Sequence, residues 1–178
     1  MKYGKKLAVC LLAAVLALAL AVLTACGGSG GGIGTAAANA YTSREGGEAL
    51  AETMGLPYDA DLQAQASIIA NWLVNSTAIR QGADHLVCKV ALSDDTNSSH
   101  QDNLNDFLDW SGCIGVPMDA VIALELQPSE SNLVPASLYV PQLTGADAAL
   151  QDYAGTGTTM GAAFIDCNGT TYVVAVFQ

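Results

Sequence analysis

The stretch that decides the fold class is the end of the chain, Thr158–Gln178 (TTMGAAFIDCNGTTYVVAVFQ). It holds two apolar, partly β-branched runs separated by Asn168-Gly169. This dipeptide is preferred in the two-residue type I′ turn of a β-hairpin, because both of its residues tolerate positive φ. The stretch therefore predicts a terminal antiparallel hairpin.

Two helices are predicted near the start of the folded region. Thr42–Glu45 has the T-x-x-E spacing of a capping box, which indicates a helix over about residues 42–54 that ends at Gly55. Either Asp59 or Asp61 can cap the second helix. Its predicted core positions recur at helical spacing, with Trp72 at their border, and are Leu62, Ala66, Ile69 and Leu73.

The middle of the chain mixes strand and helix patterns. His85–Leu92 (HLVCKVAL) partly alternates and predicts a strand, whereas Leu104–Trp110 (LNDFLDW) predicts a short helix. Pro117 can open a further helix that runs through Leu126. The segment Ala120–Leu126 (AVIALEL) is also readable as a strand.

The first 25 residues have the organisation of an export signal. Three basic residues, Lys2, Lys5 and Lys6, precede the apolar run Leu7–Thr24. The run is long enough for a transmembrane anchor, which is the alternative interpretation. Small residues and glycine follow it, however, where a stop-transfer anchor usually carries Lys or Arg.

Leu23–Cys26 (LTAC) resembles the lipobox of bacterial lipoproteins, in which the signal is cut before the cysteine and the sulfur is diacylated. The resemblance implies a signal peptide over residues 1–25 and a lipidated Cys26. We therefore expect a protein that is lipid-anchored to the cell membrane at its extracytoplasmic face. Residues 26–40 would be the lipidated cysteine and a glycine-rich tether, and residues 41–178 the folded domain.

Charge is strongly partitioned along the chain. All 17 acidic residues lie at or beyond Glu45, while only three of the six basic residues lie beyond residue 25, which gives the predicted mature chain of 153 residues a formal net charge of −14. Such a charge repels phosphate backbones, so nucleic acid is excluded as an expected partner. Membrane affinity would come from the acyl chains.

Two segments of the chain resemble parts of the same domain family. Asn39–Val74, with the turn Gly55–Pro57 followed by Asp59–Leu62, resembles the opening of the CAP domain of cysteine-rich secretory, antigen 5 and pathogenesis-related 1 proteins. Leu143–Gln178 resembles the closing segment of the same domain. The resemblance implies a fold of the α+β class, an α-β-α sandwich with helices on both faces of a central antiparallel sheet.

The cleft of that family usually holds two histidines and two acidic residues that can bind a divalent metal. His85 matches the first histidine, but Ala146 stands where the second would be, and alanine has no lone pair to donate. Glu125 is the candidate for one carboxylate, although the family's Gly-Glu-Asn motif is absent. We predict His85 and Glu125 as cleft residues, with no metal, no cofactor and no catalytic residue.

Two function classes follow. The first is a non-enzymatic binding module for a small apolar or lipid ligand or an envelope protein. A gap between helix and sheet would favour it, lined by Met54, Trp72, Phe107 and Trp110. The alternative is a cell-envelope hydrolase that acts on peptide or glycan through His85, Glu125 or Ser111.

Three cysteines, Cys88, Cys113 and Cys167, remain once Cys10 leaves with the signal and Cys26 carries lipid. Only one intramolecular bridge can form among three thiols. The three pairings stay open, with Cys113–Cys167 slightly favoured.

Overall fold

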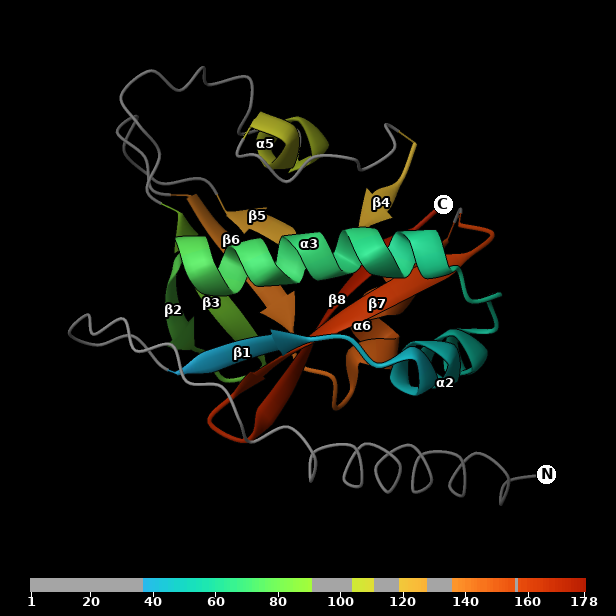
Figure 1. Cartoon of the computed structure of the whole chain (residues 1–178), viewed down its shortest axis with the longest axis horizontal. Helices are drawn as coiled ribbons and strands as arrows, with labels where there is room; N and C mark the ends of the chain where they lie inside the picture. The colour runs from blue at the N-terminus through green and yellow to red at the C-terminus, as the bar shows by residue number, and fades with distance from the viewer. Residues whose placement is uncertain (1–36, 91–103, 111–118, 128–135, 156) are drawn as a thin grey trace. The chain divides into compact units, whose positions relative to one another are not determined.

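The terminal hairpin is present in a computed structural model of the chain (Figure 1). Strand β7 (Met160–Cys167) pairs antiparallel with β8 (Thr170–Phe177) along its whole length. Asn168 and Gly169 have φ values of 53° and 78°, as a type I′ turn requires. The hairpin prediction is confirmed.

The structure describes residues 37–90, 104–110, 119–127, 136–155 and 157–178. All of them belong to the unit Gly34–Gln178. The predicted signal peptide and the predicted lipidation site at Cys26 lie outside the described residues. No helix among the described residues is long and apolar enough to cross a membrane.

The described strands form two four-stranded antiparallel sheets, whereas the resemblance implies a single central sheet. The first has the order β1 (Ala38–Tyr41), β7, β8 and β4 (Val121–Ile122). The second has the order β2 (Ala78–Gln81), β3 (His85–Val90), β6 (Ala136–Pro141) and β5 (Glu125–Gln127). A bridge between Gln142 and Tyr172 links the end of β6 to β8.

Segment 121–127 passes from one sheet to the other, so the predicted helix through Leu126 is wrong there and the strand alternative is correct. Pro117 itself lies outside the described residues. The physical reason is visible in the packing: Ile122 and Leu124 are buried in the larger core cluster, whereas Ala123 between them is buried in the smaller one. Only an extended chain directs successive side chains to opposite sides.

The helices are α2 (Arg44–Met54), α3 (Ala60–Ser76), α5 (Leu104–Trp110) and α6 (Ala146–Ala154). The predicted capping box is wrong by one residue, because the Ser43 hydroxyl, not Thr42, accepts from the Gly46 amide at 3.0 Å. Gly55 ends α2 with a φ of 73°, as predicted. Asp59 caps α3, which decides between the two candidates.

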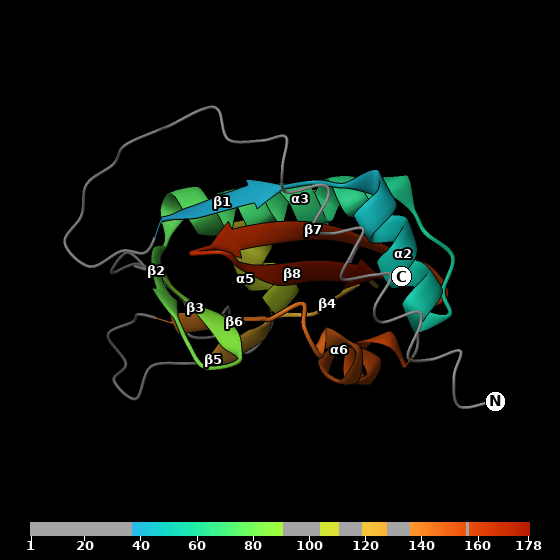
Figure 2. The same ribbon diagram turned by 90° about the horizontal axis from the view of Figure 1, so that it is seen from below.

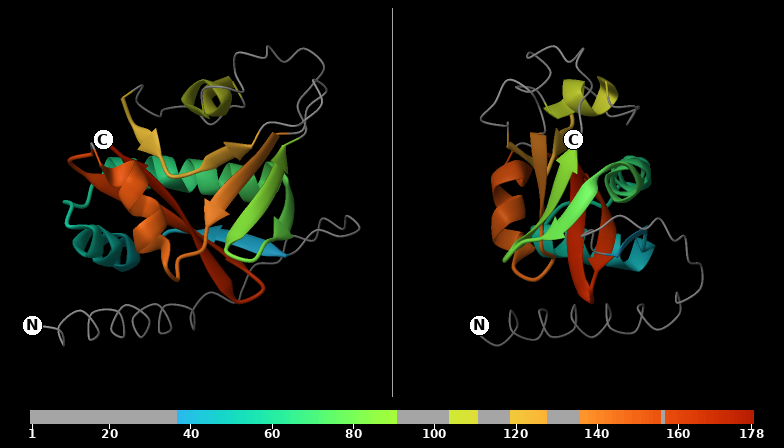
Figure 3. Two further views of the ribbon diagram at one scale, coloured as in Figure 1. Left: turned by 180° about the vertical axis from the view of Figure 1, so that it is seen from behind. Right: turned by 90° about the vertical axis from the view of Figure 1, so that its left-hand side faces the viewer.

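Helices pack on both faces of the first sheet (Figures 2 and 3). The β7 side chains alternate between two core clusters. Ala163 and Ile165 belong to the larger cluster, together with residues of α3 and of the second sheet. Ala162 and Phe164 belong to the smaller cluster, together with residues of α2 and α6. The predicted core positions of α3 are all buried, and Trp72 packs against their border. The α+β class is confirmed.

The folded part begins earlier than predicted. Ala38–Tyr41 pairs with β7, and Ala38 and Ala40 pack against the larger cluster. The last residues assigned to the tether over 26–40 are therefore part of a strand, and the boundary at residue 41 moves to Ala38. Short side chains hid this strand from the sequence pattern, because alanine is a weak strand former.

Candidate functional site

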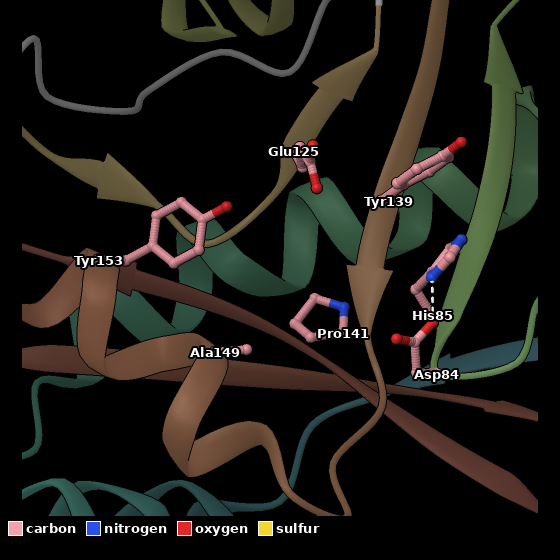
Figure 4. Close-up of a pocket in the computed structure, with 7 residues that line it drawn as sticks. All are labelled: Asp84, His85, Glu125, Tyr139, Pro141, Ala149 and Tyr153. Atoms are coloured by element: carbon pink, nitrogen blue, oxygen red, sulfur yellow. Dashed lines mark hydrogen bonds and ion pairs between the residues drawn. The ribbon is translucent and has the colours of Figure 1, made fainter.

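A pocket of about 180 Å³ lies between α6 and the second sheet (Figure 4). Its lining residues come from the β2–β3 turn, β3, β5, β6 and α6, and are Asp84, His85, Glu125, Tyr139, Pro141, Ala149 and Tyr153.

Strand register places the sheet residues of the pocket on one face. Glu125 pairs with Tyr139 across β5 and β6, and His85 pairs with Pro141 across β3 and β6. Side chains alternate along a strand, so Leu138 and Val140, the two neighbours of Tyr139 in β6, point to the opposite face. There they are buried in the larger core cluster. Tyr139 and Pro141 are thereby left for the pocket.

The imidazole of His85 is held from two directions. Its Nδ1 lies 2.5 Å from Oδ1 of Asp84, and its ring stacks on Tyr139 with centroids 4.2 Å apart and planes inclined by 25°. The His85 side chain is 30 % exposed, whereas that of Asp84 is 86 % exposed. The ring is therefore fixed in orientation at the edge of the pocket while its carboxylate partner faces solvent.

Glu125 and Tyr153 form another part of the wall. Oε1 of Glu125 accepts a hydrogen bond from Nε2 of the Gln127 side chain. Burial raises the pKa of the Tyr153 hydroxyl, and the negative charges of Glu125 and Asp152 raise it further. Tyr153 is therefore a neutral phenol at physiological pH and a potential hydrogen-bond donor.

The structure brings the two predicted cleft residues together, since His85 and Glu125 line the same pocket. Ala146, which the resemblance aligned with the second histidine, is buried in the smaller core cluster at 1 % exposure. The nucleophile candidate Ser111 lies outside the described residues. Among the described residues that line the pocket there is no Ser, Thr or Cys.

Sequence reasoning missed Asp84, Tyr139 and Tyr153. The β6 strand that carries Tyr139 was not predicted, although Leu138 and Val140 alternate with Tyr139 in SLYVP. Tyr153 follows Ala149 by four residues, so both lie on one side of α6. Nothing in the local pattern indicates that this side faces β5 and β6.

Three of the four side chains that would line the apolar gap favouring a binding module pack in or against the cores instead. Met54 belongs to the smaller core cluster, while Phe107 is fully buried in the larger one. Trp72 meets Phe107 edge-on with centroids 6.2 Å apart. These side chains are core on opposite sides of the hairpin, and the side chain of Trp110 lies outside the described residues.

Cys88 and Cys167 are free thiols buried in the larger core cluster. The favoured Cys113–Cys167 bridge is therefore wrong, and Cys113 itself lies outside the described residues. Burial raises the pKa of Cys88 to about 12. Burial likewise raises the pKa of Cys167, so both thiols are protonated and poorly reactive at neutral pH.

Within the described residues, no group of three or more His, Cys, Asp or Glu side chains is placed to hold a metal ion. No family model, curated protein or solved structure matches this chain.

Proposed function

We propose that the protein is a lipoprotein anchored through Cys26 at the extracytoplasmic face of the cell membrane, and that its folded domain is a divergent CAP-like binding module. The LTAC segment supports the anchor. The terminal hairpin and the helices on both faces of the first sheet support the likeness to a CAP domain. The buried Ala146 supports the loss of that family's histidine pair.

The chemistry of the pocket lining is the observation that carries the binding function. The described lining residues present two carboxylates, two phenols and an imidazole, and none of them is a Ser, Thr or Cys that could serve as a nucleophile in covalent catalysis. Its volume of about 180 Å³ is smaller than the roughly 300–1,000 Å³ of a drug-sized ligand site. The pocket fits one side chain or one head group of a ligand or an envelope protein, not a whole lipid.

A hydrolase of peptide or glycan is the second candidate, and the Asp84–His85 contact is the observation that favours it. A carboxylate at Nδ1 orients an imidazole as it does in general-base catalysis. His85 and Glu125 would then activate a water molecule directly, without a protein nucleophile.

Turnover assays on peptide and glycan substrates separate these two functions. We expect the purified protein to release no more product than the His85→Ala and Glu125→Gln variants, because binding alone requires no proton transfer. Fluorogenic peptides and chromogenic glycosides provide the measurement. Turnover by the wild type that both substitutions abolish would establish the hydrolase and overturn the binding module.

The anchor makes a separate prediction. Cys26→Ala removes the sulfur that would carry the diacylglyceryl group, so we expect the variant to keep its first 25 residues and to lose its acyl modification. Mass spectrometry of the N-terminal peptide from the membrane fraction reports both properties. An unmodified Cys26 in the wild-type protein at the membrane would contradict the lipoprotein assignment.

A further inference from the structure

We propose that the pocket between α6 and the second sheet binds an alkylammonium group, carried by a free amine or by a lysine side chain of an envelope protein. This inference rests on the proposed binding function and names the chemistry that the pocket recognises. Its five polar lining residues supply the recognition: Asp84, His85, Glu125, Tyr139 and Tyr153.

The charge of the lining selects a cation. Two carboxylates, those of Asp84 and Glu125, line the pocket, and none of its described lining residues is Lys or Arg. Arg80 and Lys89 lie on the same face of the sheet by register, but neither is among the lining residues. An anionic ligand would be repelled at short range, and the mature chain's net charge of −14 would attract a cation from a distance.

The aromatic rings make an organic cation a better fit than a hydrated inorganic ion. Tyr139 and Tyr153 come from β6 and α6 and line the same pocket (Figure 4). His85 stacks on Tyr139, which holds that ring in place. An ammonium group over the face of a tyrosine ring is attracted by the ring quadrupole.

Hydrogen-bond capacity matches the three donors of a primary ammonium. Glu125 uses Oε1 to accept from Gln127, which leaves lone pairs on its carboxylate for a ligand. The Tyr153 hydroxyl points toward Glu125 (Figure 4), and its oxygen is a further acceptor.

The alkyl part of the ligand also has a surface to contact. Pro141 and Ala149 are the two non-polar lining residues, and they contribute small apolar groups to the pocket. A chain of a few methylene groups fits there, as the stem of a lysine or of a simple primary amine would. Lining that joins an apolar patch to charged and aromatic groups suits an alkylammonium better than a bare metal cation.

Ligand-observed saturation-transfer NMR on the full-length protein in detergent micelles tests the proposal with n-butylammonium chloride as the probe. We expect saturable binding with a Kd on the order of millimolar, as suits a ligand of few atoms. Glu125→Gln should weaken it about fivefold by removing one partly exposed ion pair. Tyr153→Leu should weaken it about threefold, whereas Tyr153→Phe keeps the ring and should stay within about twofold.

Two controls separate recognition from diffuse attraction. Glu52→Gln removes the same charge from an exposed site on α2, and it should leave the Kd unchanged. The neutral probe 1-butanol should not bind. Equal weakening by Glu52→Gln and Glu125→Gln, equal binding of butanol, or no saturable binding of butylammonium would each overturn the proposal.

The source of the group is settled by comparing n-butylammonium with the peptide acetyl-Gly-Lys-Gly-amide and its norleucine analogue. Tighter binding of the lysine peptide would assign the pocket to a protein partner, and tighter binding of the free amine would assign it to a small ligand. Failure of both amines would refute the alkylammonium proposal alone, because the turnover assay and the Cys26 modification test the binding module and its anchor independently.

Discussion

Replacing Gly161 with alanine is expected to lower the free energy of unfolding by about 3 kcal/mol or more, because overpacking a rigid contact displaces backbone. A Cβ atom at this position would lie 2.0 Å from the amide nitrogen of Gln63 and 2.4 Å from the carbonyl carbon of Leu62. Both atoms belong to the backbone of α3, which cannot rotate away as a side chain could. Strand β7 and helix α3 would have to separate.

The same region is fixed by hydrogen bonds that make such a separation costly. The Asp59 amide donates to the Met160 carbonyl at 2.8 Å, and the Met160 amide donates to the Pro57 carbonyl at 3.0 Å. Urea unfolding followed by circular dichroism measures the change. Gly155→Ala is the matched control, since a Cβ there meets nothing within 4 Å. Similar midpoints for the two variants would show that the close approach of β7 to α3 is wrong.

Gln63→Ala is expected to lower the free energy of unfolding by about 2–3 kcal/mol, because buried hydrogen-bond partners left unsatisfied cost about 1–3 kcal/mol each. The Gln63 amide donates to the carbonyls of Ser43 and Ala162, both at 3.0 Å. Its Oε1 accepts from the Tyr58 hydroxyl. One side chain on α3 thus joins the start of α2, the loop before α3 and strand β7.

Asn71→Ala provides the control for Gln63→Ala. Asn71 is an exposed amide on the same helix, and its side chain donates at 2.8 Å to the Ser67 carbonyl one turn earlier. Both substitutions gain the helix propensity of alanine, so the difference between them reports the buried contacts. If chemical denaturation gave the same loss of stability for both variants, the role assigned to Gln63 would be contradicted.

Local patterns predicted the elements whose stability is decided by nearby residues. Asn168-Gly169 was sufficient for the hairpin, because its two positive φ values are a property of the turn itself. Asp59 and the helical spacing up to Leu73 were sufficient for α3. In these cases capping, turn chemistry and burial all indicate the same structure.

Long-range pairing explains what the sequence left undecided. Segment 121–127 is extended because it must reach β8 with Val121 and β6 with Glu125, and neither partner is near it in sequence. The pocket depends on the same pairing, since Glu125 meets Tyr139 only through the β5–β6 register. His85 and Glu125 could be proposed from residue type and a family likeness, whereas Tyr153 required the packing of α6.

We propose that the pocket between α6 and the second sheet is the binding site of this domain. The most direct measurement is a ¹H–¹⁵N correlation spectrum of the labelled full-length protein, assigned and titrated with n-butylammonium. We predict saturable shift changes that gather at His85, Glu125, Tyr139 and Tyr153 and that disappear in Glu125→Gln. Shift changes of equal size on α2 and at the Asn168-Gly169 turn would contradict the assignment of the pocket as the binding site. The absence of shift changes at the pocket at a saturating concentration of the probe would contradict it as well.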